Sequence, residues 1–306
     1  MAEFQLTTPV AFIIFNRPDT TERVFAEIAR AKPPKLLVVA DGARPDRPGE
    51  MAKVTAARAI LKRIDWDCEI LTNFSDVNLG CRQRVSSGIN WVFEQVEEAI
   101  ILEDDCLPDP TFFRFCEELL ERYRHDQRIG MISGDNFQFG RRRNDDSYYF
   151  SKYFHIWGWA TWRDRWIDSY DVSLSKWPTI RDEDWLTDMV GNANEASDWK
   201  DIFERAYRGE IDTWDYQWVF ANWVAGRISI LPTVNVISNL GFDADATHTK
   251  RASIVANLPR TAITFPLVHP LGIFKNTRAD QYSKQYFQSP LTTRILKKLA
   301  GRLRGQ

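Results

Sequence analysis

Three consecutive acids, Glu103, Asp104 and Asp105, follow directly on the apolar stretch 99–102. Adjacent carboxylates repel one another, and Glu103 should still belong to a buried strand, where an unpaired carboxylate is costly. Mg²⁺ and Mn²⁺ would offset this repulsion, because they prefer oxygen ligands and usually share them with the phosphates of a substrate. The stretch therefore predicts a Mn²⁺ or Mg²⁺ site for a diphosphate-bearing substrate. The alternative is a solvated turn whose acids cap the following helix.

Further polar residues are expected at the same edge of the fold. Asp41 ends a second apolar run and Asp135 follows a third. Ligands of open α/β sheets bind at the carboxyl ends of the strands, so these acids should gather on one rim. Neither GxGxxG nor GxxxxGK[ST] occurs in the chain, which leaves phosphate binding to cationic side chains such as Arg17 and Arg82. The alternative for each arginine is a solvated or salt-bridged surface residue.

Strands and helices alternate in the first half of the chain. Five stretches are typical of strands, at 9–15, 35–41, 68–73, 99–104 and 129–136, and the apolar runs 9–15 and 35–41 indicate strands buried in a parallel sheet. Four helical stretches lie between them, at 19–31, 50–64, 79–98 and 109–124. We expect Asp19 and Thr20 to cap the first helix, and Asp109 with Pro110 to begin the fourth. The pattern predicts an α/β fold with a mainly parallel central sheet and helices on both faces.

The alternation degrades after about residue 145, where tryptophan becomes frequent. Ten of the twelve tryptophans lie between 157 and 223. We expect an α+β portion that packs on the first half and forms one wall of a cleft. Trp157, Trp159 and Trp214 are candidates for stacking on the ring of a sugar, although most tryptophans of a protein belong to its core.

Two acids in this second portion are candidates for a general base. Asp215 stands between Trp214 and Trp218, which could desolvate it and raise its pKa, and Asp212 is the second candidate. The alternative is that Asp212 caps the helix that follows and leaves Asp215 at its third position. His248 could supply a metal ligand, or it is an exposed loop residue.

Charge is unevenly distributed along the 306 residues, whose formal net charge is −2. Residues 164–215 hold fourteen Asp and Glu against six Lys and Arg, whereas 250–306 hold eleven Lys and Arg against a single Asp. The near-neutral total indicates no particular partner, and we expect no nucleic acid. The segment 292–306 predicts a basic amphipathic helix of the kind that lies on an anionic membrane. Its alternatives are a helix packed on its own domain or a frayed tail.

Compartment is predicted from the cysteines and the N-terminus. The four cysteines form no CxxC pair and suit neither a zinc site nor a disulfide framework. The first 18 residues lack the features of a signal peptide, and no run approaches ~20 apolar residues. We therefore expect reduced thiols in a cytoplasmic protein, with any membrane contact peripheral and at the inner face.

Several stretches, taken in order, resemble the GT-A nucleotide-sugar glycosyltransferases, in particular N-acetylglucosaminyltransferase I and bacterial family-2-like relatives. The stretches are "NRP", "ADG", "NLGCRQRVSSGINWVFE", "IILEDDCLPDPTFFRF", "ISGDN", "FHIWGWATWRDRW", "DTWDYQW" and "GFDADATHT". Together they span roughly residues 9–250. Trp157 stands where that family has the first glycine of its acceptor segment, and Tyr216 stands where it tends to have a second acid.

The resemblance implies a GT-A fold (Rossmann-like, of the nucleotide-diphospho-sugar transferase type) and a metal-dependent, inverting hexosyl- or hexosaminyltransferase. The donor would be a UDP-sugar, and the acceptor a hydroxyl of a carbohydrate or lipid-linked glycan. By the same resemblance Asp105 would coordinate Mn²⁺ or Mg²⁺, and Glu103 and Asp104 would contact hydroxyls of the donor sugar and ribose. Asp41 would accept a hydrogen bond from the nucleotide base, and Arg17 would face the diphosphate.

Three parts are predicted along the chain. Residues 1–145 form the half that binds nucleotide-sugar and metal, 146–255 the acceptor and catalytic-base half of the same domain, and 256–306 a basic C-terminal extension. Two rival functions are a metal-dependent phosphohydrolase or nucleotidyltransferase, and a non-catalytic carbohydrate-binding protein. The segment "FNRPDTT" lacks the glycine- and arginine-rich loop of sugar nucleotidyltransferases, and sugar binding alone does not require crowded acids.

Overall fold

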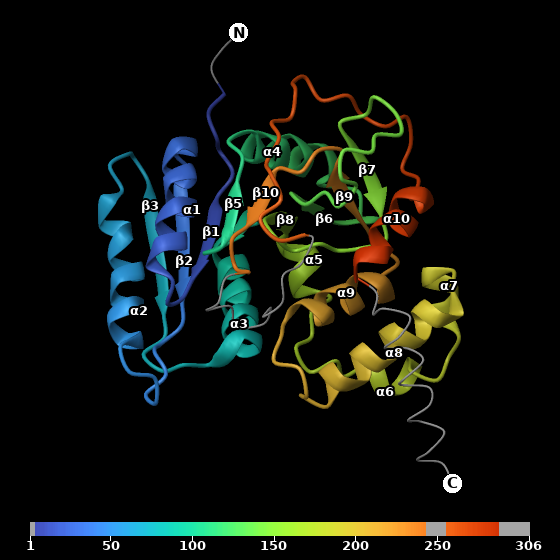
Figure 1. The fold of residues 1–306 in the computed structure, drawn as a ribbon, viewed down its shortest axis with the longest axis horizontal. Helices are drawn as coiled ribbons and strands as arrows, with labels where there is room; N and C mark the ends of the chain where they lie inside the picture. Colours follow the sequence, from blue (N-terminus) through green and yellow to red (C-terminus); the bar gives the residue numbers. More distant parts are fainter. Residues whose placement is uncertain (1–3, 243–254, 288–306) are drawn as a thin grey trace.

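The computed structural model describes residues 4–242 and 255–287, and one large sheet forms their centre (Figure 1). Its eight strands are β1 (Val10–Ile14), β2 (Lys35–Ala40), β3 (Glu69–Phe74), β4 (Glu98–Glu103), β6 (Ile129–Ser133), β7 (Tyr148–Ser151), β8 (Trp159–Trp162) and β9 (Ile228–Pro232). They lie in the order β3-β2-β1-β4-β8-β6-β9-β7. A second sheet pairs β5 (Cys106–Pro108) with β10 (Ile237–Asn239), antiparallel.

The first four strands of the order form the parallel part of the sheet, as predicted. β8 lies between β4 and β6 and is antiparallel to both, while β9 is parallel to β6 and β7 is antiparallel to β9. The prediction of a mainly parallel α/β sheet is thus confirmed. Strands from the second half of the chain complete the same sheet, which therefore crosses the predicted boundary at residue 145.

Helices cover both faces of the sheet, as the alternation predicted. They are α1 (Pro18–Ala31), α2 (Glu50–Ala59) with a short 3₁₀ turn (Ile60–Arg63), α3 (Gly80–Gln95), α4 (Thr111–Tyr123), α5 (Arg163–Ile167), α6 (Trp177–Ile180), α7 (Trp185–Val190), α8 (Ala193–Tyr207), α9 (Asp215–Val224) and α10 (Thr277–Phe287). Figure 1 shows α6, α7, α8 and α9 gathered at one side of the molecule, close to α10. None of the helices described is both long and apolar enough to cross a bilayer.

Two hydrophobic cores lie on opposite faces of the sheet, and β1 contributes to each. Phe12 points into the core formed with α1 and α4. Ile13, the next residue, points into the core formed with α3, α5 and α9. This alternation follows from the two-residue period of a strand and explains why a strand buried on both faces is apolar throughout.

The start of α1 differs from the prediction. The helix begins at Pro18, and neither Asp19 nor Thr20 caps it. Arg17 is the N-cap residue, and its carbonyl accepts the backbone N–H of Thr21 at 2.9 Å. Proline suits the first helical position, because its φ is preset and the N–H that it lacks would have no partner there. The helix therefore begins at Pro18, one residue before the predicted start. Arg17 is consequently fixed at the junction between β1 and α1.

α3 approaches the sheet closely because of one glycine. A Cβ added to Gly88 would lie 2.4 Å from Cγ1 of Val39 in β2, closer than two carbon atoms can pack. The missing side chain therefore sets the distance between α3 and the sheet, and with it the position of the N-terminal end of α3.

We expect Gly88→Ala to destabilise the protein by about 1–3 kcal/mol through overpacking, although alanine favours the helix itself. Urea unfolding measures this loss. Adding Val39→Ala should relieve the overlap with the new methyl group. The double variant should therefore lose less stability than the sum of the losses of the two single variants. Ser87→Ala, one position earlier in α3, is the control and should change stability little. Additive losses in the double variant would contradict the close contact.

Candidate active site

Arg17 lies against the carboxylates that follow β4. Its Nη1 is 2.6 Å from Oδ2 of Asp105 and 3.6 Å from Oδ1 of Asp104. The backbone N–H of Phe15 donates to Oδ2 of Asp104 at 2.9 Å. β1 and β4 are hydrogen-bonded neighbours, so the loop after β1 necessarily meets the end of β4. The structure thus brings together the predicted cation and the predicted acids.

The acid triplet carries less negative charge than its composition suggests. Burial raises the pKa of Asp104 to about 7, and the charge of Asp105 adds to the rise. The pKa of Glu103 is raised well above its usual value, first by burial and then by the charges of Asp105, Asp104 and Asp215. Arg17 opposes both shifts. The negative charge of the triplet is therefore reduced by protons on the buried carboxyls and balanced by the guanidinium of Arg17. The sequence alone had led us to expect a metal ion in this role.

A second segment closes over Asp105. The backbone N–H of Leu240 donates to the Asp105 carbonyl at 2.8 Å, next to the paired strands β5 and β10. A Cβ added to Gly241 would lie 2.1 Å from Oδ2 of Asp105, so a larger residue there would force the Asp105 carboxylate to move. The side chain of Asn239 accepts the Gly241 N–H at 2.7 Å and fixes this approach.

Asp41 follows β2 on the predicted rim, but its carboxylate is occupied by the chain itself. Its Oδ1 accepts the backbone N–H groups of Gly42 and Leu79, both at 2.9 Å. Its Oδ2 accepts the Gly80 N–H at 3.1 Å and the Asn78 side chain at 3.0 Å. Asp41 thereby positions the start of α3. A hydrogen bond to a nucleotide base stays a prediction, and it would require one of these donors to yield.

Asp212 and Arg82 meet at the same helix end. Oδ1 of Asp212 accepts the backbone N–H of Arg82 at 3.1 Å, so Asp212 caps α3 rather than α9. The alternative that Asp212 caps the helix after it is therefore wrong, because the segment that carries Asp212 folds back to α3. Arg82 directs its guanidinium to the carbonyl of Val172, at 2.6 Å, instead of towards the acid triplet. Its role in binding phosphate stays a prediction.

Asp215 is the first residue of α9 and not its third. The Thr213 hydroxyl donates to its carboxylate. Trp214, immediately before it, is 2 % exposed and stacks on Trp159 with ring centroids 5.7 Å apart. Because Trp214 is anchored in the core, the next residue, Asp215, is held beside these packed tryptophan rings.

The burial of Trp159 and Trp214 removes them as stacking residues for a ligand. Their rings pack with Trp166 and Trp218 into one aromatic cluster, and all four are at most 2 % exposed. A buried ring has no face left for a sugar. Trp157 differs, because it is only partly buried and borders an open hollow. Of the three tryptophans predicted to stack on a sugar, Trp157 is the one that lines a hollow.

Cys81 marks the place where both groups of acids meet. It lies in the first turn of α3. Burial raises the pKa of its thiol, and the charges of Glu103, Asp215, Asp212 and Asp105 raise it further. Because electrostatic interactions weaken with distance, the four carboxylates that act on this thiol lie near it. The end of β4 and the start of α9, far apart in the sequence, thus both lie near the first turn of α3.

A hollow of about 400 Å³ opens beside Asp215. We call it the aromatic hollow. Its aromatic lining consists of Phe137, Tyr153, Phe154, His155, Trp157, Trp199 and Tyr216, and its acids are Asp135, Glu195, Asp198, Asp201 and Asp215. Aromatic faces with carboxylate acceptors are the usual means of holding a sugar.

Asp135 is the most deeply buried acid of the aromatic hollow, at 1 % exposure. Its Oδ2 accepts the backbone N–H of Trp157 at 3.1 Å. Its Oδ1 has no hydrogen-bond partner among the described residues, and burial raises the pKa of the carboxyl well above its usual value. A buried acid that holds a proton can donate a hydrogen bond to a ligand in the hollow.

One wall of the aromatic hollow, α8, was not anticipated as functional. Glu195, Asp198, Trp199 and Ile202 follow one another at helical spacing, a signal that would have marked one face of this helix. His155 was also missed, although it precedes Trp157 in "FHIWGW". Burial lowers its pKa to about 3, so the ring is neutral.

The acids suit a hard cation with few protein ligands. In the parts of the chain described, no three His, Cys, Asp or Glu side chains are arranged to hold a metal ion, and His248 lies outside those parts. Carboxylate oxygens are what Mg²⁺ and Mn²⁺ prefer, and Oε1 of Glu103 is buried without a hydrogen-bond partner among the described residues. Such a donor set fits a cation that takes one or two carboxylates and shares substrate phosphates for the rest.

Comparison with known proteins adds little to this geometry. No protein-family model and no curated protein matches the chain significantly. Among solved structures, the chain is similar to the crystal structure of mouse xyloside xylosyltransferase 1 in its apo form, with 10 % sequence identity and a TM-score of 0.33. That likeness covers 70 % of this chain and 81 % of the other. We draw no functional conclusion from a likeness of this strength.

Arg17→Gln tests the charge balance of the acid triplet. With a pKa of about 7 in the folded protein, against 3.8 ordinarily, Asp104 keeps a proton that the unfolded chain releases. Folding stability therefore falls as the pH rises between these values, and removing the nearest cation should deepen that fall. We expect Arg17→Gln to cost about 3 kcal/mol near pH 8 and clearly less near pH 5, where the acids hold their protons.

Urea unfolding at both pH values measures the difference. Arg17→Lys keeps a positive charge and should recover most of the stability lost near pH 8. An equal loss at the two pH values would show that Arg17 acts by packing and not by its charge.

Proposed function

We propose that the protein is a glycosyltransferase that moves a sugar from a nucleoside diphosphate donor to a hydroxyl of a glycan or lipid-linked glycan. One observation carries the proposal: the charges of Glu103, Asp105 and Asp215 all act on Cys81, Arg17 pairs with Asp105, and Asp215 borders the aromatic hollow. A diphosphate site and a sugar-sized hollow thus adjoin one carboxylate that could act between them.

The donor would bind over the carboxyl ends of β1, β2 and β4. Arg17 would turn from Asp105 towards the diphosphate, whose negative charge competes for the same guanidinium. Asp104 and Glu103 would accept hydrogen bonds from hydroxyls of the ribose and sugar. Uridine as the base and a GT-A architecture rest on the resemblance of the sequence motifs.

The acceptor would occupy the aromatic hollow, against Trp157. Asp215 would take the proton from the attacking hydroxyl as the new glycosidic bond forms and the bond to the diphosphate breaks. A single displacement of this kind inverts the anomeric centre. Asp135 would orient the acceptor by a hydrogen bond from its protonated carboxyl. A hexosyl or hexosaminyl group suits a hollow of about 400 Å³.

Asp105, with Glu103 behind it, would hold Mn²⁺ or Mg²⁺ together with the donor phosphates. When bound, the ion would stabilise negative charge on the departing diphosphate as a Lewis acid. His248 as a further ligand belongs to the same proposal. A cytoplasmic location, peripheral at the inner face of the membrane through the helix expected at 292–306, also stays a proposal, since that segment lies outside the described residues.

Asp215→Asn tests the general base. We expect transfer to fall by about 10²–10⁴-fold while donor binding is retained, because asparagine keeps the shape but cannot accept a proton. Initial rates with a panel of nucleotide sugars and glycan acceptors measure transfer, and calorimetric titration with donor measures binding. Asp188→Asn, an exposed acid of α7, is the control and should be unaffected. Full turnover by Asp215→Asn would show that Asp215 is not the base. Loss of turnover in Asp212→Asn alone would move the role to Asp212.

Thermal unfolding with UDP and Mn²⁺ tests the donor site. At a ligand concentration about 100 times its Kd, binding stabilises a protein by about 2.7 kcal/mol, which raises the unfolding midpoint by several degrees. We expect UDP and Mn²⁺ together to raise it more than the sum of the two alone, and Asp105→Asn to abolish this synergy. A shift with UDP that is unchanged by Mn²⁺ would assign the diphosphate to Arg17 without a metal. No shift with any nucleoside diphosphate would refute the proposal.

A further inference from the structure

Two segments far apart in the sequence form one edge of the molecule. The loop between β6 and β7 and the segment that leads into α10 run beside each other there (Figure 1). Two hydrogen bonds join them: the Ser147 N–H donates to the Val268 carbonyl at 2.8 Å, and the Val268 N–H donates to the Ser147 hydroxyl at 2.9 Å. We call this the α10 edge.

Large apolar side chains are exposed along the α10 edge. Leu271 is fully exposed, and Phe274 and Val268 are 79 % and 51 % exposed. Phe139, on the other segment, is 37 % exposed. Single exposed apolar residues are ordinary on protein surfaces, but four on two adjoining segments indicate an interaction site.

The turn that carries Phe139 is held rigidly. Phe139 and Gly140 both have positive φ, of 49° and 79°, and the Arg141 N–H closes the turn on the Gln138 carbonyl at 3.0 Å. Gln138 is 1 % exposed, and its side chain donates to the hydroxyl of Ser283 in α10 at 2.6 Å. A phenylalanine is strained in the left-handed region, so its outward position is maintained by this anchoring.

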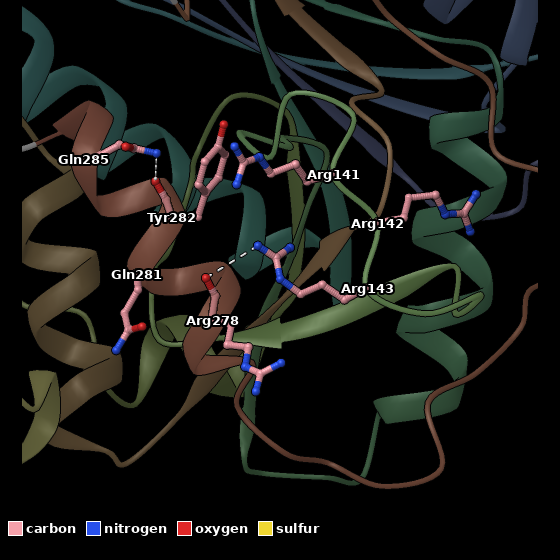
Figure 2. Close-up of a pocket in the computed structure, with 7 residues that line it drawn as sticks. All are labelled: Arg141, Arg142, Arg143, Arg278, Gln281, Tyr282 and Gln285. Atoms are coloured by element: carbon pink, nitrogen blue, oxygen red, sulfur yellow. Dashed lines mark hydrogen bonds between the residues drawn. The ribbon is translucent and has the colours of Figure 1, made fainter.

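Arginines lie in the same loop as Phe139 and at the start of α10. Arg141 lies over the ring of Tyr282 at 4.1 Å, and Arg143 donates to the carbonyl of Arg278 at 3.5 Å. Figure 2 shows that Arg142 extends away from α10 and that the Arg278 side chain points in another direction again. Guanidinium groups that diverge in this way cannot converge on one small anion. They suit an extended anionic surface.

Acidic residues offset only part of this charge. Asp145 and Asp146 follow the arginines in the same loop. Asp280 is buried at 3 % exposure, with the Ser151 hydroxyl donating to it at 2.5 Å, so it faces the protein interior. The outward face of the α10 edge is therefore basic.

We propose that the α10 edge docks on an anionic lipid bilayer, with Phe139, Leu271 and Phe274 entering the interface and the arginines contacting lipid phosphates. Exposed apolar tips distinguish a bilayer from a soluble polyanion, which offers no apolar layer to receive them. The sequence that follows α10 supports this choice, since 288–306 contains five Lys and Arg and no acid. None of the exposed apolar residues and arginines of the α10 edge lines the aromatic hollow, and the proposal does not depend on sugar transfer.

Co-sedimentation of the full chain with vesicles tests the proposal. We expect binding to phosphatidylcholine vesicles that contain phosphatidylglycerol and none to phosphatidylcholine alone. Each arginine near an anionic surface contributes about fivefold, so Arg141→Gln, Arg142→Gln and Arg143→Gln together should weaken binding by about 100-fold. Leu271→Ser with Phe274→Ser should weaken it by at least about tenfold.

Matched controls make the result specific. Arg23→Gln, Arg30→Gln and Arg47→Gln remove the same charge elsewhere, and Met51→Ser with Val77→Ser removes exposed apolar residues elsewhere; both sets should bind as the wild type does. Thermal unfolding checks that every variant is folded. Unchanged vesicle binding by both α10-edge variants would overturn the proposal. Binding to heparin without binding to vesicles would do so too, and would assign the arginines to a soluble polyanion.

Discussion

The repulsion among three carboxylates at the end of a buried strand is the constraint on which the candidate site depends. Glu103, Asp104 and Asp105 leave β4 in a region with little water, and like charges there are strongly unfavourable. The protein answers with Arg17 at 2.6 Å from Asp105 and with protons retained on buried carboxyls. A guanidinium ion pair can open when a better anion arrives. The resting charge balance and the proposed binding of a diphosphate therefore concern the same few atoms.

Much of the surrounding fold serves to bring these charges to one place. The parallel pairing of β1 with β4 sets Arg17 beside the triplet, and Pro18 fixes the residue at the start of α1. Asp41 and Asp212 both accept backbone N–H groups at the N-terminal end of α3, so two acids from distant segments hold one helix end. These contacts hold the N-terminal end of α3 through the chain's own groups.

Local patterns predicted what depends on neighbours in sequence. The apolar runs identified β1, β2 and β4, and the rule that parallel strands share their carboxyl edge placed Arg17 with Asp105. Such patterns could not predict which distant strands pair. The residues of β8 do not indicate that this strand lies between β4 and β6. The burial of Trp159 and Trp214 was missed for a related reason, because a tryptophan suits a core and a sugar platform equally well. The cap formed by Asp212 depends on a loop returning to a helix 130 residues earlier.

The four packed tryptophans below Asp215 have a practical consequence. Coupled indole rings give strong near-ultraviolet circular dichroism, and their emission responds to charge and polarity at the border of the cluster. Trp214 is joined covalently to Asp215, so a change at that carboxylate reaches the cluster directly. The protein thus carries its own optical reporter, and a change at Asp215 can be followed without a label.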